Sequence, residues 1–358
     1  MSPLKAARSM PARRSNCGWR QAAVRPFASS HRSRAMRALA LLALLSLATP
    51  ALAQPAETGE VIRLDPIGSE QLEARPISIY LPPGYDTGME TYPVIYAMDG
   101  QNLFEPGYSY AGVEWGLDEE MDRLIAEGRI RPAIIVGIWN TPARAREYAP
   151  RQVFDTYSEA SRSRALEAWG GLPVSDIFLT FLAEDLKPYI DRNYRTRPGP
   201  DATALMGSSM GGLISFYGLT RYPETFGSAA GLSTHWPIYA DASHQDPAVA
   251  DAWREQALLA WAEYLDTTHL DPQTHRIWFD HGSINLDSLY PPYQSAIDAI
   301  MAEQGFIGPA NYRSTLYEGA DHNEAAWHAR LADPLTFLLG IEAAANPASR
   351  MPQSRTPQ

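Results

Sequence analysis

The five residues Gly207 to Gly211 read Gly-Ser-Ser-Met-Gly, which matches the pattern Gly-x-Ser-x-Gly. A short apolar run, 202–206, precedes them and a helix-like run, 212–221, follows. This context predicts a sharp strand-to-helix turn that presents Ser209 as a nucleophile. The glycines fit because side chains would collide in so tight a turn. Free amides and the positive dipole end of the helix would favour an oxyanion beside Ser209.

A serine hydroxyl needs a base to take its proton at neutral pH, and imidazole has a suitable pKa. In the chain order Ser, acid, His, the base follows the last strand. His322 lies in the loop after the expected strand 312–317 and is the predicted base. His328 competes, but it falls inside the following helix. His275 and His281 lie in or beside the preceding strand and are expected to have structural or pocket-lining roles.

The acid that orients the base is expected in the loop after the strand 276–280. Asp287 is the preferred candidate and Asp280 the alternative. A carboxylate at the strand end, such as Asp280, can merely pair locally, and Asp287 at a helix start can merely cap free amides. Asn285 has the shape of the acid without its charge. The identity of the carboxylate stays open at this point.

Two backbone amides normally stabilise the negative oxygen of a tetrahedral intermediate. One is expected from Met210, directly after the nucleophile. The other is expected from the loop after the third strand, where Gln101 is the preferred residue and Gly100 and Asn102 are alternatives.

The sequence lacks the patterns of metal and nucleotide sites. There is no His-Glu-x-x-His, the histidines are scattered, and no glycine-rich phosphate loop occurs. The single cysteine, Cys17, lies in the basic N-terminal segment. No metal and no cofactor are therefore predicted, which favours cofactor-free hydrolysis or acyl transfer.

Apolar runs of strand length alternate with longer amphipathic stretches. Strands are expected at 61–64, 76–81, 94–98, 133–138, 202–206, 228–232, 276–280 and 312–317, and helices at 117–127, 174–194, 211–221, 248–265, 286–304 and 324–339. The alternation predicts an α/β fold with a mostly parallel sheet, helices on both faces and an antiparallel N-terminal edge. This is the order of the α/β-hydrolase fold, in a single domain spanning 54–341. Insertions at 140–171 and 235–271 should cover the site.

Residues 1–53 contain nine Lys or Arg and no acidic residue. From Met36, a basic start, an apolar run at 38–48 and Ala51-Leu52-Ala53 form the pattern of a signal peptide spanning 36–53, cleaved after Ala53. The apolar run is too short to span a bilayer, which takes about 20 residues. The expectation is a periplasmic or secreted protein with no stable membrane anchor. The tail 342–358 is expected to be disordered.

Removal of that segment leaves 21 of the 30 Lys and Arg against all 41 acidic residues, a formal charge of −20. Nucleic-acid binding needs clustered positive charge, so no nucleic-acid partner is expected. The sequence does not indicate an oligomeric state.

Several motifs resemble those of an esterase family that includes esterase D, S-formylglutathione hydrolases, enterochelin and other siderophore esterases, and feruloyl or acetyl-xylan esterases. They lie at 80–85, 96–104, 147–150, 186–191, 207–212, 222–227 and 322–324, with Trp327. The resemblance implies Ser209 as nucleophile and His322 as base. Some relatives have an acid at the position of Asn285, whereas the most similar branch has Leu-Asp before a Tyr, which here is Asp287. Some siderophore-cleaving members use a Ser-His pair.

The substrate is expected to be a small-molecule or glycan-linked ester. Trp139, Tyr148, His235 and Trp236 follow strands at the catalytic edge and are predicted to line its pocket. Two other functions stay open. The same residues could pass the acyl group to a sugar or lipid alcohol, or a non-catalytic member could bind a siderophore or glycan.

Overall fold

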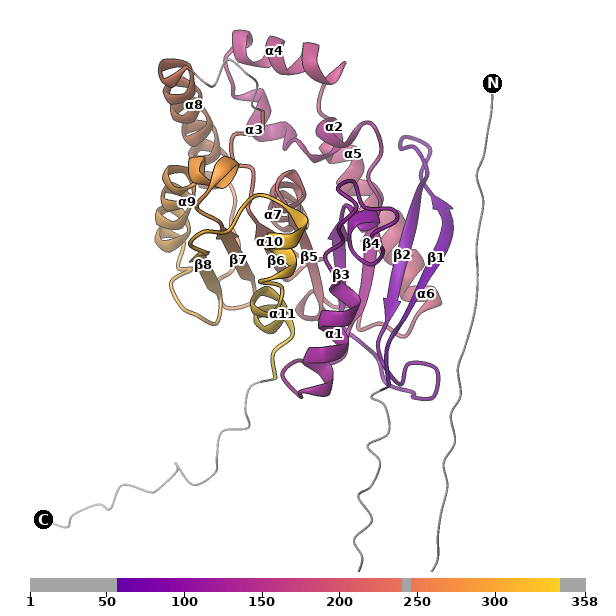
Figure 1. Cartoon of the computed structure of the whole chain (residues 1–358). Coiled ribbons are helices and arrows are strands. Elements are labelled where there is room, and N and C mark those ends of the chain that lie inside the picture. Colours follow the sequence, from indigo (N-terminus) through magenta and orange to yellow (C-terminus); the bar gives the residue numbers. More distant parts are fainter. Residues whose placement is uncertain (1–56, 240–245, 342–358) are drawn as a thin grey trace, which may run out of the picture. The chain divides into compact units, whose positions relative to one another are not determined.

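The structure is a computed structural model that describes residues 57–239 and 246–341 (Figure 1). The export segment 1–53 and the tail 342–358 lie outside the described residues. One sheet has the strand order β1-β2-β4-β3-β5-β6-β7-β8. Its strands are β1 (Glu60–Ile67), β2 (Arg75–Leu81), β3 (Val94–Met98), β4 (Ile134–Ile138), β5 (Thr203–Ser208), β6 (Ser228–Leu232), β7 (Arg276–His281) and β8 (Tyr312–Leu316).

Strand β2 pairs antiparallel with both β1 and β4, and every other pairing in the sheet is parallel. The central strands β3, β4 and β5 are buried along their whole length, as expected for a parallel sheet covered on both faces. The predicted α/β-hydrolase fold with its antiparallel N-terminal edge is therefore confirmed.

Helices cover both faces of the sheet (Figure 1). They are α1 (Leu117–Ala126), α2 (Arg144–Tyr148), α3 (Arg151–Asp155), α4 (Glu159–Trp169), α5 (Ser175–Thr180), α6 (Lys187–Asn193), α7 (Met210–Arg221), α8 (Pro247–Asp266), α9 (Pro291–Glu303), α10 (Glu324–His328) and α11 (Ala332–Leu339). Alternate side chains of β3 point to opposite faces. Tyr96 packs with the core that includes α7, and Ile95 with the core that includes α1 and α11.

The expected helix 174–194 is continuous over 175–193, but it is not a regular α-helix throughout. Between α5 and α6 the chain forms a π-helical stretch, Phe181–Leu186. Pro188 stands at the start of α6 and has no N–H for an intrahelical bond. A π-helical turn accommodates such an interruption without ending the helix. Similarly, the expected helix 286–304 begins as a 3₁₀ turn, Asn285–Leu289, before Pro291, and the expected helix 324–339 is divided into α10 and α11.

The stretches expected as insertions contain α2, α3 and α4 after β4, and α8 after β6 (Figure 1). Residues 240–245 of the second stretch are outside the described ranges. Aromatic contacts join the two: the ring centroids of Tyr157 and Trp253 are 5.5 Å apart, and those of Trp169 and Tyr239 are 5.7 Å apart. The two insertions therefore pack as one unit. Within 57–239 and 246–341, no helix has the length and hydropathy that a bilayer crossing needs.

Candidate active site

Ser209 stands alone between β5 and α7 in a backbone conformation that L-residues rarely adopt, with φ 54° and ψ −124°. Its peptide groups are held from three sides. Its N–H donates to the carbonyl of Leu232 at 2.9 Å, and its carbonyl accepts from the N–H of Leu213 at 3.1 Å and of His235 at 3.2 Å. Such strain persists where the surroundings fix the backbone, and it concentrates at functional sites. The side chain is half-buried.

The glycines of the motif are needed because backbone approaches closely at this turn. A Cβ on Gly207 would lie 2.5 Å from the carbonyl carbon of Gly211. A Cβ on Gly211 would lie 3.1 Å from both Oδ2 of Asp99 and Cβ of Met98. The spacing of the motif therefore follows from the contact of α7 with β5 and with the end of β3.

His322 lies in the loop between β8 and α10. Its ring meets those of Trp327 and Tyr290 edge to face, with centroids 5.1 Å and 5.8 Å away. Its Nδ1 is 2.6 Å from Oδ1 of Asp287. A carboxylate accepts a hydrogen bond, so Nδ1 carries the proton and Nε2 of neutral His322 has a free lone pair.

Asp287 is completely buried and accepts three hydrogen bonds. Besides His322, the hydroxyl of Ser233 and the N–H of Gly282 donate to its Oδ2, each at 2.6 Å. Burial acts to raise the pKa of Asp287, but the three hydrogen bonds outweigh it and hold that pKa below its usual value. The carboxylate is therefore ionised at neutral pH.

The alternative acid, Asp280, is equally buried but faces another partner. Its Oδ1 accepts from Nε of Arg330 at 3.0 Å and its Oδ2 from Nε1 of Trp278 at 2.9 Å. Burial raises the pKa of Asp280, and the hydrogen bonds and the charge of Arg330 offset it only in part. Asn285 is bound to Asp321 instead. Of these three residues, only Asp287 is hydrogen-bonded to His322.

Two consecutive residues at and after the end of β6, Leu232 and Ser233, link Ser209 to the His322–Asp287 pair. The N–H of Ser209 is bound to Leu232, and the next residue, Ser233, is bound to Asp287. Within the described ranges, the hydroxyl of Ser209 forms no hydrogen bond with any side chain, His322 included. Catalytic hydrogen bonds are often longer in unliganded sites and tighten when substrate binds.

The two amides expected to bind an oxyanion both lie at helix starts. Met210 opens α7, and Gln101 lies in the 3₁₀ turn Gly100–Asn102 after β3. Neither N–H donates to another described residue, as is usual for the first turn of a helix. The side-chain oxygen of Gln101 accepts from the N–H of Asn140 at 3.2 Å, which ties its loop to the end of β4.

Asp99 precedes this turn in the left-handed conformation, with φ 57°. Arg144 donates two hydrogen bonds to its carboxylate, from Nε at 2.7 Å and from Nη2 at 2.8 Å. Asn140 adds a third bond at 2.6 Å. The two partners are 45 residues apart, so the sequence around Arg144 carries no local pattern that indicates this pair.

The model of the family "Putative esterase" matches residues 69–338. The chain belongs to this esterase family. It is 27% identical over 163 residues to the uncharacterized protein YbbA of Bacillus subtilis, covering 45% of this chain and 58% of YbbA. It is 28% identical over 153 residues to the ferri-bacillibactin esterase BesA of the same organism, covering 40% and 49%. The chain thus spans less than two thirds of the length of these relatives.

Solved structures share the fold of this family member. A mutant feruloyl esterase module from Clostridium thermocellum, in complex with sinapinate, aligns with a TM-score of 0.54 at 17% identity, covering 78% of this chain and 88% of that one. The BES protein from Bacillus cereus aligns with a TM-score of 0.52 at 18% identity, covering 82% of this chain and all of that one. These alignments agree with the family assignment at the level of the fold.

Two of the four pocket predictions need correction in this esterase-family chain. Tyr148 and Trp236 are completely buried and belong to the hydrophobic core. The hydroxyl of Tyr148 accepts from the N–H of Asp99 at 3.4 Å, and Trp236 donates to the side chain of Gln294 at 3.0 Å. A residue that follows a strand can point into the core as readily as into a cleft, and neither residue offers surface to a ligand here.

Trp139 and His235 are half-buried and remain candidates for substrate contact. Trp139 donates from Nε1 to the hydroxyl of Ser78 at 2.9 Å, and its ring lies 5.4 Å from that of Tyr108. Nδ1 of His235 is 2.8 Å from the hydroxyl of Tyr290, the residue that also packs on His322. His235 therefore lies close to the base.

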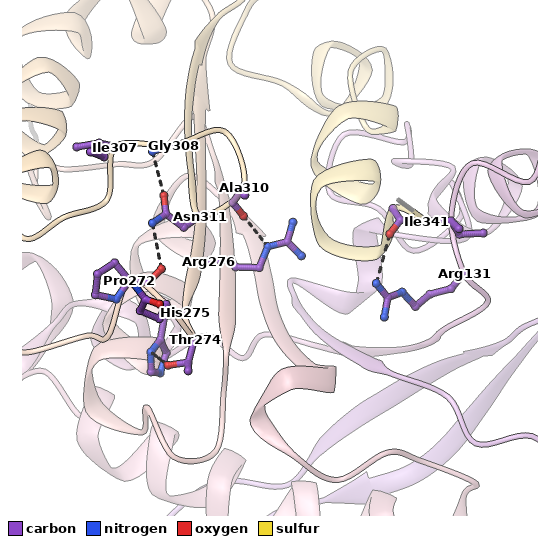
Figure 2. Close-up of a pocket in the computed structure, with 12 residues that line it drawn as sticks. Arg131, Pro272, Thr274, His275, Arg276, Ile307, Gly308, Ala310, Asn311 and Ile341 are labelled. Carbon is purple, nitrogen blue, oxygen red and sulfur yellow. Dashed lines mark hydrogen bonds between the residues drawn. The ribbon is translucent and has the colours of Figure 1, made fainter. Parts of the chain in front are cut away.

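A cavity of about 940 Å³ lies elsewhere, and Figure 2 shows its lining. Arg276 is the first residue of β7, and Asn311 directly precedes β8. The cavity is thus at the amino ends of the strands, whereas Ser209 follows the carboxyl end of β5. Open α/β sheets bind ligands at their carboxyl edge, so this family member's chemistry is not expected in that cavity. No group of three or more metal-ligating side chains occurs in 57–239 and 246–341.

Proposed function

We propose that the protein is an exported serine esterase that hydrolyses a carboxylic ester through an acyl-enzyme on Ser209. Family membership supports the reaction class. The observation that carries the proposal is the 2.6 Å contact of His322 with buried Asp287, beside a serine in a strained turn. The periplasmic or secreted location remains an inference from residues 1–53, and purification of the exported form with a new N-terminus at Gln54 would test it.

In the proposed first half-reaction, Nε2 of His322 takes the proton of the Ser209 hydroxyl as its oxygen attacks the ester carbonyl. The carbonyl oxygen becomes an oxyanion within reach of the amides of Met210 and Gln101. The ionised Asp287 stabilises the imidazolium that forms. His322 then gives the proton to the departing alcohol, which leaves an acyl ester on Ser209.

In the second half-reaction, water gives a proton to His322 and attacks the acyl ester. The same oxyanion contacts form, and collapse of the intermediate releases the acid while the proton returns to Ser209. No step needs a metal or cofactor, so we propose none. An alcohol in place of water would give acyl transfer, and analysis of products with and without alcohol acceptors separates the two.

For the substrate, we propose a small or medium ester, free or linked to a glycan. Support comes from the names of similar proteins, which include a ferri-bacillibactin esterase and a feruloyl esterase. A panel of acetyl, feruloyl and siderophore lactone esters would rank these classes. We propose no nucleic-acid partner and no stable membrane anchor.

The decisive experiment is active-site labelling with an alkyl fluorophosphonate. Wild type should become labelled on Ser209 and lose its turnover of p-nitrophenyl acetate. Ser209→Ala should not become labelled and should not turn over p-nitrophenyl acetate. Ser215→Ala is a matched control, because Ser215 is buried in α7 and, among the residues that the structure describes, its hydroxyl bonds only the carbonyl of Gly211. Labelling that persists in Ser209→Ala would refute the assignment of the nucleophile.

A further inference from the structure

Ser233, the residue after β6, holds a hydroxyl whose three hydrogen bonds are all satisfied by protein. Nε1 of Trp327 donates to its Oγ at 3.0 Å, and Nη2 of Arg330 donates to it at 2.8 Å. Its Oγ also lies 2.6 Å from Oδ2 of Asp287. Ser233 is completely buried, and Arg330 is 4% exposed.

The chemistry of the partners fixes the direction of each bond. The indole N–H and the guanidinium can only donate, so they occupy the two lone pairs of the Ser233 oxygen. Its one proton must then go to Asp287. A hydroxyl usually rotates among partners, but this one has a single orientation.

The backbone at Ser233 indicates that the side chain matters. Its φ is 47°, in the left-handed region where glycine is favoured over residues with a Cβ. Its N–H donates to the carbonyl of Asp280 at 2.8 Å, which holds the turn beside β7. A strained non-glycine residue whose hydroxyl has three hydrogen bonds, two of them to charged side chains, fits a functional constraint.

We propose that Ser233 is a positioning residue for the reaction: held as an obligate donor by Arg330 and Trp327, it occupies Oδ2 of Asp287 and leaves Oδ1 for His322. Gly282 donates to the same Oδ2. Both oxygens of the acid thus have assigned partners, and the carboxylate cannot turn away from the imidazole. The proposal rests on the proposed function, since it concerns how the acid of that site is held.

Arg330 connects this unit to the second buried carboxylate. It binds Asp280 at 3.0 Å, and its Nη2 is 4.0 Å from Oδ2 of Asp287. The positive charge of Arg330 thus compensates the negative charges of Asp280 and Asp287, both of which are shielded from solvent. The alternative is a purely structural role, in which Ser233 only attaches α10 and the link after it to the sheet through Trp327 and Arg330, and the experiment must distinguish the two.

The first arm is a double-mutant cycle on ester hydrolysis. Ser233→Ala should lower kcat roughly tenfold with KM unchanged, because Ser233 does not face the substrate. In an Asp287→Ala background the same change should cost almost nothing further, because the group it acts through is gone. If the losses multiply in the double variant, Ser233 acts independently of Asp287 and the proposal is overturned.

Thr234→Val is the matched control. Thr234 is the next residue and is also buried, but its hydroxyl has no partner within the described part of the chain. Removing it should leave kcat within about twofold of wild type. Should Ser233→Ala fail to fold, Ser233→Cys keeps the size and a weak donor, and it should give a smaller loss of kcat of the same kind.

The second arm does not depend on turnover. The proton between Nδ1 of His322 and Asp287 should give a downfield signal in the proton NMR spectrum of wild type and of Thr234→Val. It should be absent in His322→Ala and shifted or broadened in Ser233→Ala. An unchanged signal in Ser233→Ala refutes the positioning role. If wild type hydrolyses no ester but the signal responds as expected, the proposed function fails while the positioning of Asp287 by Ser233 stands.

Discussion

Two regions flank Ser209, and they hold their functional groups by different means. On one side, the loops after β6, β7 and β8 hold Asp287 through bonds that link it to Ser233 and Arg330, and these three side chains are almost fully buried. Asp287 in turn binds His322, whose side chain is 13% exposed. On the other side, the loops after β3 and β4 place Gln101 through Arg144, whose side chain is 30% exposed. The difference teaches that the acid behind the base is held by contacts that exclude water, whereas the oxyanion side depends on a cation that reaches in from the surface.

The oxyanion side has a second ion pair, which lies deeper in the core. Helix α2 contributes Arg144 to Asp99, and it contributes Glu147 to a two-bond ion pair with Arg75 at 2.7 Å and 2.8 Å. The side chains of Arg75 and Glu147 are 0% and 2% exposed. A short helix without a long apolar face is thus held by charge, on β2 through Glu147 and at the oxyanion turn through Arg144.

Removing the charge of Asp287 should give the largest effect, because it disrupts the side of the site that holds the base His322. Asp287→Asn should lower kcat/KM roughly 10³- to 10⁴-fold, because an amide no longer stabilises the imidazolium and can select the wrong tautomer of His322. Asp280→Asn should lower kcat/KM much less, because Asp280 does not touch His322. Steady-state kinetics on both variants decide, and a larger loss in Asp280→Asn would reverse the assignment.

Breaking the buried Arg75–Glu147 ion pair should lower the free energy of unfolding more than the other substitutions would. Arg75→Met leaves the carboxylate of Glu147 buried without its counter-charge and should lower the free energy of unfolding by about 3–5 kcal/mol. Adding Glu147→Leu should restore part of that loss. Urea unfolding measures both. The control is Arg123→Met in α1, whose pairs with Glu120 and Glu127 are exposed at the surface, and its expected cost is below about 1 kcal/mol. Equal costs for Arg75→Met and Arg123→Met would contradict the prediction.

Removing the side chain of Arg144 should have a smaller effect, and this effect should appear in kcat. Arg144→Ala leaves Asn140 as the side chain that holds the Asp99 carboxylate, so the turn that carries Gln101 can shift. We expect kcat to fall about 10- to 100-fold, less than or comparable to the loss of one oxyanion donor. Arg144→Lys should recover only part, because lysine cannot form both bonds. Single-turnover kinetics test this, and an unchanged kcat in Arg144→Ala would show that Asp99 holds the turn unaided.

The sequence allowed the fold to be predicted and candidates for the site to be named, for reasons that these two regions make clear. Ser209 and His322 can be proposed as nucleophile and base because a tight turn and a loop after the last strand leave local patterns. Asp287 was preferred from chain order, but only coordinates separate it from Asp280. Tyr148 was misread, because a residue's place after a strand does not say which way its side chain points.

The residues that sequence reasoning missed act across long separations. Ser233 and Arg330 are 97 residues apart, and Asp99 and Arg144 are 45 residues apart. A lone Ser or Arg has no local pattern that distinguishes a buried partner from a solvated side chain. One signal is present in the sequence: residues 147–150 are among the motifs that resemble the esterase family, and Glu147 of this motif forms the buried pair with Arg75.

The smallest expected effect is on the pH dependence of stability, in which Asp287 and Asp280 should differ in sign. The pKa of Asp287 is lowered in the folded protein, so its stabilisation is present above the unfolded pKa of about 3.9 and is lost as pH falls through the lower folded pKa. The pKa of Asp280 is raised by burial, so its contribution has the opposite sign: it is present below about pH 3.9 and lost as pH rises through the higher folded pKa.

Urea unfolding of wild type, Asp287→Asn and Asp280→Asn between about pH 3 and 7 tests this, because the other titrating groups cancel in each difference. As pH falls toward 3, the stability advantage of wild type over Asp287→Asn should shrink, and that over Asp280→Asn should grow. If both differences move in the same direction, then the two carboxylates do not differ in the way that their hydrogen bonds indicate, and Ser233, Gly282 and His322 together do not outweigh the burial of Asp287.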